Sequence, residues 1–221
     1  MATAQKNKTA RGATPDLSAS DEVNRRQALI RASAKLFREK GFEATTVRDI
    51  ANAVGMRSGS PFYHFANKHE ILRAVMEEGL RQGLDRCEYA LAAARTPQER
   101  FRALVRTHYG ILHDDGSEFI AVLLYDWRSL PEEHKKDIIA VKDAYDRLWQ
   151  DNLKELIRMG AIGANSGRDL QAPLDEKMAR LMILGAINFS VTWYRQRPRS
   201  KSALNLDALA DETVHFFMRE K

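Results

Sequence analysis

The sequence predicts an all-α protein of about nine helices, on the basis of three observations. Apolar residues recur three and four positions apart along most of the 221-residue chain, which is the spacing of a helix with one buried face. Signals that start a helix, such as Thr46 and Thr96, alternate with signals that end one, such as Gly41 and Gly55. No segment alternates apolar and polar residues as a strand does, and no internal repeat is found. We therefore expect helices packed against helices.

The chain begins with a polar segment, residues 1–20, that we expect to be a disordered basic arm. Two interpretations stay open for it, a solvated tail and an arm that enters the minor groove of DNA. A first helix is expected from Asp21 to Lys40, and Gly41 ends it. The residues expected to face inward follow helical spacing: Leu29, Ala32, Leu36 and Phe37.

A second, shorter helix is expected to begin after Thr46. The Thr46 hydroxyl can accept from a free backbone N–H, and Asp49 can return the bond and favours the positive end of the helix dipole. Gly55 then provides a left-handed C-cap that turns the chain sharply. The apolar face of this helix consists of Val47, Ile50, Ala51 and Val54.

A third helix is expected to begin near Ser58 and no earlier. Pro61 would break a helix interior, but three residues after an N-cap its missing N–H has no helical partner in any case. The small residues Ser58, Gly59 and Ser60 let the backbone approach base edges, and free N–H groups at a helix start suit a phosphate. This pattern is typical of a helix whose N-terminus enters a DNA groove.

The next residues along the chain extend the same surface. Tyr63, His64 and Lys68 carry groups that reach phosphates. Phe62 and Phe65 are expected to face inward and hold the helix to its neighbours. The alternative is a helical hairpin in an ordinary core, but a core helix would not begin Arg-Ser-Gly-Ser and then place Tyr, His and Lys on one side.

Charge supports a polyanionic partner for this part of the chain. Residues 1–70 hold 12 Lys and Arg against 7 Asp and Glu, whereas residues 71–221 hold 23 of each. The whole net charge of +5 therefore lies in the segment that carries the predicted DNA reader.

The rest of the chain continues as helices. Asn67 caps a long helix to about Ala94, which at 1.5 Å per residue measures roughly 40 Å and could couple the DNA-binding unit to the C-terminal helices. Thr96 starts the next helix, with Pro97 at its first position and Glu99 as the capping-box partner. This helix is expected to span about 96–113, and the helices after it about 117–129, 131–159, 174–195 and 206–219. A Gly-rich loop is expected at 160–172.

The helix expected at 174–195 is apolar nearly all round, so it must be covered on every side. One chain's core covers part of it, and a second copy of the chain is the expected cover for the rest. The final helix, 206–219, would lie alongside. The alternative is complete burial within one monomer.

Composition excludes several classes of protein. Cys87 is the only cysteine, so no intrachain disulfide forms and we expect a reducing, cytoplasmic location. We expect no signal peptide and no membrane partner, because the most apolar stretch, 181–193, is shorter than the roughly 20 residues of a membrane span. We expect no metal site, no cofactor and no catalytic residues, because no metal-ligand spacing, glycine-rich phosphate loop, nucleophile elbow or zincin motif occurs. An all-α enzyme and a pure interaction module remain as alternatives.

Residues 22–79 resemble the N-terminal domain of the TetR family of bacterial transcriptional repressors. The resemblance implies a homodimer formed through the last two helices that reads a palindromic operator on double-stranded DNA. It also implies three parts: the arm at 1–20, a helix-turn-helix domain at 21–66, and a domain at 67–221 that binds a small-molecule effector and dimerises. The residues that carry the resemblance are Leu36-Phe37, Gly41-Phe42, Thr45-Thr46-Val47, Ile50-Ala51, Val54-Gly55, Gly59-Ser60, Phe62-Tyr63-His64-Phe65 and Lys68.

The resemblance also implies a set of DNA contacts. Many members carry Tyr where this chain has Phe62 and an aliphatic residue where it has Pro61, so one phosphate-directed hydroxyl is missing. Tyr63 is the residue that could supply it. Base edges or their borders are assigned to Arg57, Ser58, Ser60 and Tyr63, and phosphates to Thr46, His64 and Lys68, with Arg48 completing the set.

The effector site is expected in the helices after residue 96, where aromatic and aliphatic residues and a few polar groups could line an apolar pocket. The segment 123–134 is similar to a TetR subgroup that responds to acyl-coenzyme A thioesters, for whose phosphates Arg128, Arg102, Arg106 or Arg195 could serve. A repressor of the same fold that responds to multiple drugs or aromatic compounds is the alternative. The residues expected to line the pocket are Tyr109, Phe119, Leu123, Trp127, Tyr145, Trp149 and Asn188.

Overall fold

The structure, a computed structural model, describes residues 17–57, 60–163, 175–194 and 205–219. Within these ranges it contains eight α-helices and two 3₁₀ turns and no strand, which confirms the predicted all-α fold. In chain order the elements are α1 (Leu17–Lys40), α2 (Val47–Ala53), η1 (Ser60–Tyr63), α3 (Lys68–Ala92), α4 (Pro97–His113), α5 (Glu118–Asp126), η2 (Trp127–Ser129), α6 (Glu132–Arg158), α7 (Glu176–Trp193) and α8 (Leu206–Phe217).

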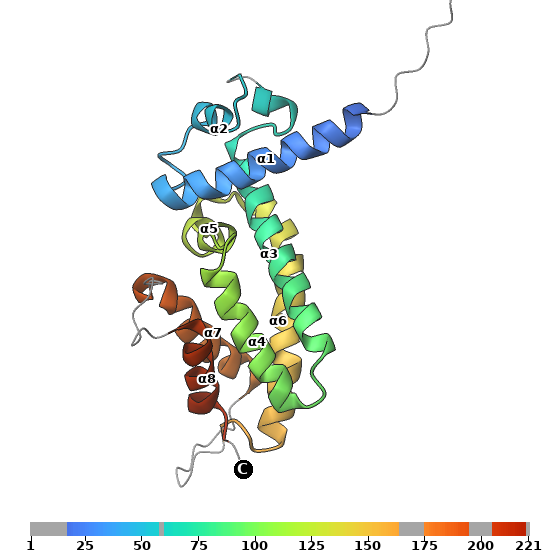
Figure 1. The fold of residues 1–221 in the computed structure, drawn as a ribbon, viewed down its shortest axis with the longest axis vertical. Helices are drawn as coiled ribbons and strands as arrows, with labels where there is room; N and C mark the ends of the chain where they lie inside the picture. The colour runs from blue at the N-terminus through green and yellow to red at the C-terminus, as the bar shows by residue number, and fades with distance from the viewer. Residues whose placement is uncertain (1–16, 58–59, 164–174, 195–204, 220–221) are drawn as a thin grey trace, which may run out of the picture.

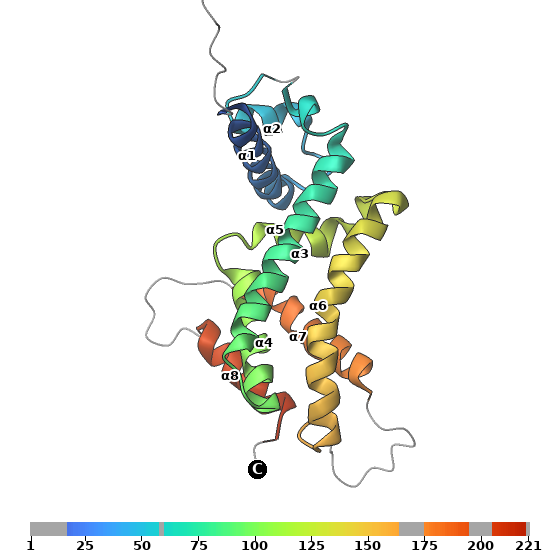
Figure 2. The same ribbon diagram turned by 90° about the vertical axis from the view of Figure 1, so that its right-hand side faces the viewer.

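The molecule is elongated, with two ends joined by a long helix. Figure 1 shows α1 lying across one end together with α2 and η1, while α7 and α8 lie toward the other end. Helix α3 leaves the first end and runs beside α4 and α6, and α5 lies between α1 and the distal helices (Figure 2). Helices α3 and α5 both contact α1 and thus link the N-terminal helices to the rest of the molecule.

Several predicted helix starts are confirmed by their caps, but that of the first helix is wrong: α1 begins at Leu17 and not at Asp21, so the last four residues of the predicted disordered arm, 17–20, are helical. The rest of the predicted arm, 1–16, lies outside the described residues. Thr46 and Thr96 both form complete capping boxes, with Asp49 and Glu99 respectively. The side chain of Asn67 accepts from the backbone N–H of Glu70 at the start of α3. The glycines expected to end α1 and to follow α2 both adopt left-handed backbone angles, with φ of 81° at Gly41 and 69° at Gly55.

The third helix differs from its prediction. Its described part is a single 3₁₀ turn, η1, and not an α-helix. Pro61 has no N–H for the helical hydrogen-bond ladder, and the N-cap Asn67 starts the next helix only six residues later, so little chain is left for a longer helix. Phe65 is buried as expected, but Phe62 is 55% exposed, so the prediction that Phe62 faces inward is wrong.

Two hydrophobic cores stabilise the two ends of the molecule. The first unites α1 and α2 with the first half of α3 and also takes in Phe119 and Val122 from α5. The second is formed by the far half of the molecule and centres on Phe101 and Trp149, whose rings meet edge to face. The first core thus extends beyond residue 66, because α3 and α5 both pack against the N-terminal helices.

Candidate functional site

The predicted DNA-contact residues described by the structure lie around α2, η1 and the start of α3. Tyr63 is 88% exposed, and Arg48 and Arg57 are not buried either. Tyr63 and His64 line a surface groove against the first half of α1. Ser58 lies outside the described residues, and the structure describes the backbone but not the side chain of Ser60.

Two members of the predicted contact set are bonded within the protein. The Thr46 hydroxyl accepts from the Asp49 N–H at 3.1 Å and donates to its carboxylate at 2.7 Å. The Lys68 ammonium donates to three backbone carbonyls between α1 and α2, at 2.9 Å for Phe42, 3.2 Å for Thr45 and 3.4 Å for Glu43. Lys68 therefore fixes this loop against the start of α3.

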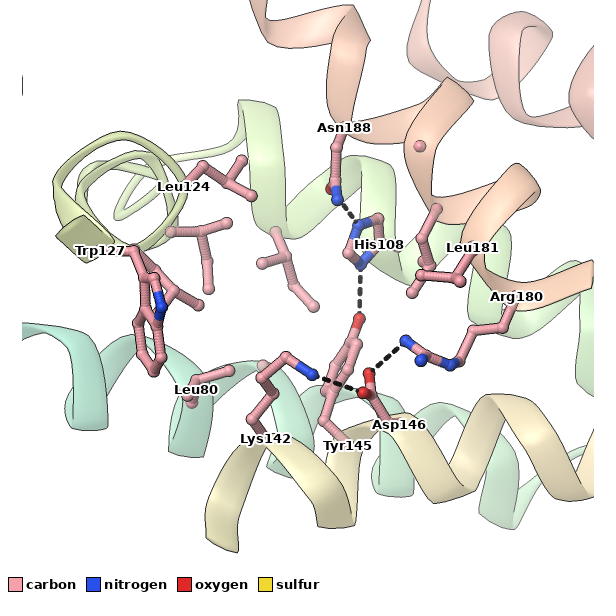
Figure 3. Close-up of a pocket in the computed structure, with 16 residues that line it drawn as sticks. Leu80, His108, Leu124, Trp127, Lys142, Tyr145, Asp146, Arg180, Leu181 and Asn188 are labelled. Carbon is pink, nitrogen blue, oxygen red and sulfur yellow. Dashed lines mark hydrogen bonds and ion pairs between the residues drawn. The ribbon is translucent and has the colours of Figure 1, made fainter. Parts of the chain in front are cut away.

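A cavity of about 480 Å³ lies between α3, α4, α5, α6 and α7, in the size range of small-molecule sites. Its lining is mostly apolar, with one polar wall made by α4, α6 and α7 (Figure 3). The lining residues are Leu80, Gly83, His108, Ile111, Ile120, Leu123, Leu124, Trp127, Lys142, Tyr145, Asp146, Arg180, Leu181, Leu184, Gly185 and Asn188.

The polar wall contains a buried hydrogen-bonded row. His108 lies in the middle, with Nδ1 at 2.5 Å from the Tyr145 hydroxyl and Nε2 at 2.8 Å from Asn188 Oδ1. The thiol of Cys87 lies 3.7 Å behind the Tyr145 oxygen. Burial lowers the pKa of His108 to about 4, so the ring is neutral near pH 7. Burial also raises the pKa of the Cys87 thiol to about 11 and that of Tyr145 well above 10.

Next to this row, Asp146 holds two cations. Its carboxylate oxygens lie 2.7 Å from Lys142 Nζ and 2.8 Å from Arg180 Nη1 (Figure 3). The Arg180 side chain is only 10% exposed, whereas that of Lys142 is 46% exposed. The Nε of Arg180 is buried without a hydrogen-bond partner. The cluster as a whole carries one net positive charge at the cavity wall.

Four of the seven predicted pocket residues line this cavity: Leu123, Trp127, Tyr145 and Asn188. The structure places the other three elsewhere. Tyr109 bonds to Thr213 of α8 at 2.8 Å, and Trp149 is completely buried behind His108. Phe119 packs so closely on α3 that a side chain at Gly79 would come within 2.7 Å of its Cβ.

Several polar residues of the cavity were not predicted from the sequence. His108, Asp146 and Arg180 were missed, although Arg180 interrupts the apolar run of α7 and could have indicated a buried acidic partner. The arginines considered for phosphates do not line the cavity: Arg128 is exposed and Arg106 pairs with Asp211 of α8 at 2.7 Å. Arg102 is also absent from the lining, and Arg195 lies outside the described residues.

Neither a metal site nor a membrane span is found in the part of the chain that the structure describes. There, no three His, Cys, Asp or Glu side chains are grouped as a metal ion would require. None of the described helices is both long and apolar enough to cross a bilayer.

Proteins of similar sequence match most of the chain. The HTH-type transcriptional repressor KstR2 of Mycolicibacterium smegmatis is 26% identical over 80% of this chain and 82% of its own length. The fatty acid metabolism regulator protein of Bacillus subtilis is 27% identical over 74% of this chain and 80% of its own length.

Solved structures share the fold over nearly the whole length. The superantigen PfiT is 37% identical, with a TM-score of 0.72 over 94% of this chain and all of its own. AibR in complex with isovaleryl coenzyme A and operator DNA is 23% identical, with a TM-score of 0.75 over 87% of this chain and 97% of its own.

Two protein-family models match this chain, one at each end of the molecule. Residues 29–75 match the model described as bacterial regulatory proteins, tetR family, which covers the second half of α1, α2, η1 and the start of α3. Residues 94–220, more than half of the chain, match the tetracyclin repressor-like C-terminal domain, which holds most of the cavity lining. The chain belongs to the TetR family of bacterial transcriptional regulators.

Proposed function

We propose that this protein is a repressor that binds a palindromic operator as a homodimer and leaves it when a small apolar effector fills the cavity. Regulators of this family bind operator DNA and small-molecule effectors, and AibR, which shares the fold, was solved with both. Because operator DNA lies in the bacterial cytoplasm, we propose that the protein acts there. We propose no enzymatic role. The observation that carries the proposal is that α5 belongs to both functional regions.

Helix α5 presents different residues to the two regions. Phe119 and Val122 pack in the core of the N-terminal end, while Ile120, Leu123 and Leu124 line the cavity. A helix is a rigid element, and packed interfaces shift between discrete arrangements more easily than they deform. An effector that displaces the cavity side of α5 would therefore move the surface on which α1 rests.

Polar contacts attach α5 to the DNA-binding unit at both of its ends. At the first end, Arg38 of α1 donates to the Ser117 hydroxyl at 2.8 Å. At the second end, the backbone N–H of Phe42 interacts with the carboxylate of Asp126, the residue before the cavity residue Trp127. The Phe42 carbonyl is one of the three that accept from Lys68. The loop before α2 thus connects to α5 and to α3.

DNA recognition can be tested with two tyrosines of nearly equal exposure. Tyr63→Ala should weaken binding to the operator about tenfold or more, because the side chain is 88% exposed beside the predicted reading surface. Tyr89→Ala, which removes an 86% exposed tyrosine from the distal half of α3, is the matched control and should bind normally. Gel shifts on the DNA upstream of the gene measure both. Equal affinity of the two variants would remove Tyr63 from the contact set.

Homodimerisation is supported by apolar side chains left uncovered in one chain. Exposed apolar patches of this kind mark protein interfaces. We expect Phe189→Glu to yield monomers in analytical ultracentrifugation, whereas Tyr125→Glu, at an exposed aromatic residue of α5, should stay dimeric. A dimeric Phe189 variant would contradict the proposed interface. The exposed apolar residues of the last two helices are Met178, Leu181, Met182, Phe189, Trp193 and Phe216.

For the effector, we propose an acyl-coenzyme A thioester. The apolar part of the cavity suits an acyl chain, the fatty acid metabolism regulator of Bacillus subtilis is a relative, and AibR shows that the fold accommodates an acyl-coenzyme A. Effectors of the multidrug or aromatic type are the alternative. Decanoyl-coenzyme A should release the protein from DNA at concentrations where decanoate does not. Equal release by both compounds, or release by neither, would contradict the thioester.

A further inference from the structure

The polar row in the cavity wall has a fixed direction of hydrogen bonding. A neutral histidine carries one N–H, and the Asn188 Oδ1 that faces His108 Nε2 can only accept. The N–H is therefore on Nε2, and Nδ1 accepts from the Tyr145 hydroxyl. The Tyr145 oxygen in turn faces the Cys87 thiol, which is the weaker donor. Which group donates in one bond of the row therefore determines which group donates in the next.

This direction determines what Asn188 offers to the cavity. Its oxygen is occupied by His108, and its Nδ2 has no hydrogen-bond partner among the described residues. Turning the amide over would place two donors against each other at His108 Nε2 unless the whole row reversed. A reversed row would keep the bond between the imidazole and the phenol, with His108 Nδ1 as the donor. The phenol would then have to donate to the Cys87 sulfur, opposite to the contact in the structure, where the thiol donates to the Tyr145 oxygen.

We propose that the amide N–H groups of Asn188 select an effector that carries a hydrogen-bond-accepting oxygen, of the carbonyl type, on an otherwise apolar body. The inference rests on the proposed function, in which the cavity holds the effector. It names Asn188 as the specificity-determining residue of that cavity. His108 acts through Asn188 as a positioning residue.

The charges of the wall favour the same class of ligand. Lys142 and Arg180 bring two positive charges to the lining against the single negative charge of Asp146, whose two oxygens are both occupied. An ammonium group entering the cavity would meet a net positive wall and the donors of Asn188. A carbonyl oxygen would instead accept from Asn188 and interact favourably with the same charges.

The apolar chain and the oxygen of such a ligand would lie on different sides of the cavity. Leu80, Leu124 and Trp127 lie on the side of the cavity away from Asn188 and Arg180 (Figure 3). An apolar chain can lie against these residues while its oxygen reaches the amide. This arrangement matches the general form of small-molecule sites, in which a few polar groups orient a ligand in an apolar cavity.

Direct binding to the full-length protein tests the proposal with two probes of equal chain length. We expect isothermal titration calorimetry to show 2-decanone binding at least tenfold more tightly than decylamine, which is protonated near pH 7 as a lysine side chain is. Equal affinity for the two probes, or tighter binding of decylamine, would overturn the proposal. The assay contains no DNA, so a loss of operator recognition would leave this result standing and would count against the proposed function alone.

Asn188→Asp is the sharpest variant, because a carboxylate still accepts from His108 but offers the cavity no donor. The ketone should bind about tenfold more weakly and the preference over decylamine should disappear. Asn188→Ala should lose ketone affinity without gaining any for the amine, and it serves if the aspartate variant does not fold. Asn52→Asp, an exposed position on α2, is the matched control. An unchanged ketone preference in both Asn188 variants would overturn the assignment.

Discussion

The helix caps of the DNA-reading end and the polar row of the cavity differ in how far apart in the sequence their bonded residues lie. At the DNA-reading end, Thr46 bonds to Asp49 and Asn67 to Glu70, each three positions away. In the cavity, His108 bonds to residues 37 and 80 positions away. Local contacts form whenever the helix forms, whereas the cavity requires α3 to α7 to be packed correctly. The cavity should therefore be the part that single substitutions disturb most.

The largest effect is expected at Asp146, where two partners of one carboxylate differ in burial. Asp146→Asn leaves the buried Arg180 guanidinium without its counter-charge and should lower the free energy of unfolding by about 3 kcal/mol. Lys142→Met removes only the half-exposed cation and should cost less than about 1 kcal/mol. Urea unfolding measures both. Losses of equal size would contradict the distinction between a buried and an exposed partner.

The next largest effect should be a loss of folding stability at acid pH, caused by His108 in the cavity wall. Burial lowers the folded-state pKa of His108 to about 4 from an ordinary value of 6.5, so below pH 6.5 the unfolded chain binds a proton that the folded chain does not. The contribution of neutral His108 to the free energy of unfolding is complete above pH 6.5. It is lost as the pH falls toward 4, by at most about 1.4 kcal/mol per pH unit. Urea unfolding from pH 7 to 4.5 should show a smaller slope in His108→Gln. Identical slopes would mean that His108 is charged in the folded protein.

A Lys68 variant can show whether this side chain supports the loop between α1 and α2 or contacts a DNA phosphate. Because its ammonium donates to three carbonyls in the free protein, Lys68→Ala should cost about 1 kcal/mol of stability and weaken operator binding through the loop. The dependence of affinity on salt should stay unchanged, since no phosphate contact is lost. A salt slope lower by about 0.9 would instead assign Lys68 to a phosphate in the complex.

The smallest effect is expected at Phe62, whose exposed ring occupies a position where many family members have tyrosine. Phe62→Tyr adds a hydroxyl to the reading surface and should tighten operator binding about threefold, the typical gain from one neutral hydrogen bond. Phe62→Leu adds no hydroxyl and should not tighten it. If both variants bind as the wild type does, position 62 lies outside the contact.

The same contrast between local and distant contacts explains what the sequence could reveal. The capping boxes at Thr46 and Thr96 and the left-handed glycines are encoded within four residues, and the structure has them where they were predicted. The prediction for Phe62 is wrong because helical spacing applies only to a regular helix, whereas Pro61 limits the described part of this segment to one 3₁₀ turn.

The cavity was only partly predictable for the same reason. Leu123, Trp127, Tyr145 and Asn188 were found from residue type on the expected helices, yet Trp149, of the same type, is buried in the core. Nothing in the sequence near Asp146 indicates that Arg180, 34 positions later, will pair with it. Such pairs are determined by tertiary packing, which a single sequence does not display.

The most direct test of the whole account is quantitative operator binding by the purified protein, with its oligomeric state measured in the same buffer. We expect one dimer to bind a palindromic site in the DNA upstream of its gene, with an affinity that falls as salt rises and a strong preference over random competitor. We further expect decanoyl-coenzyme A to abolish this binding. A monomer that binds all duplexes equally, or a complex that no cavity ligand affects, would contradict the account.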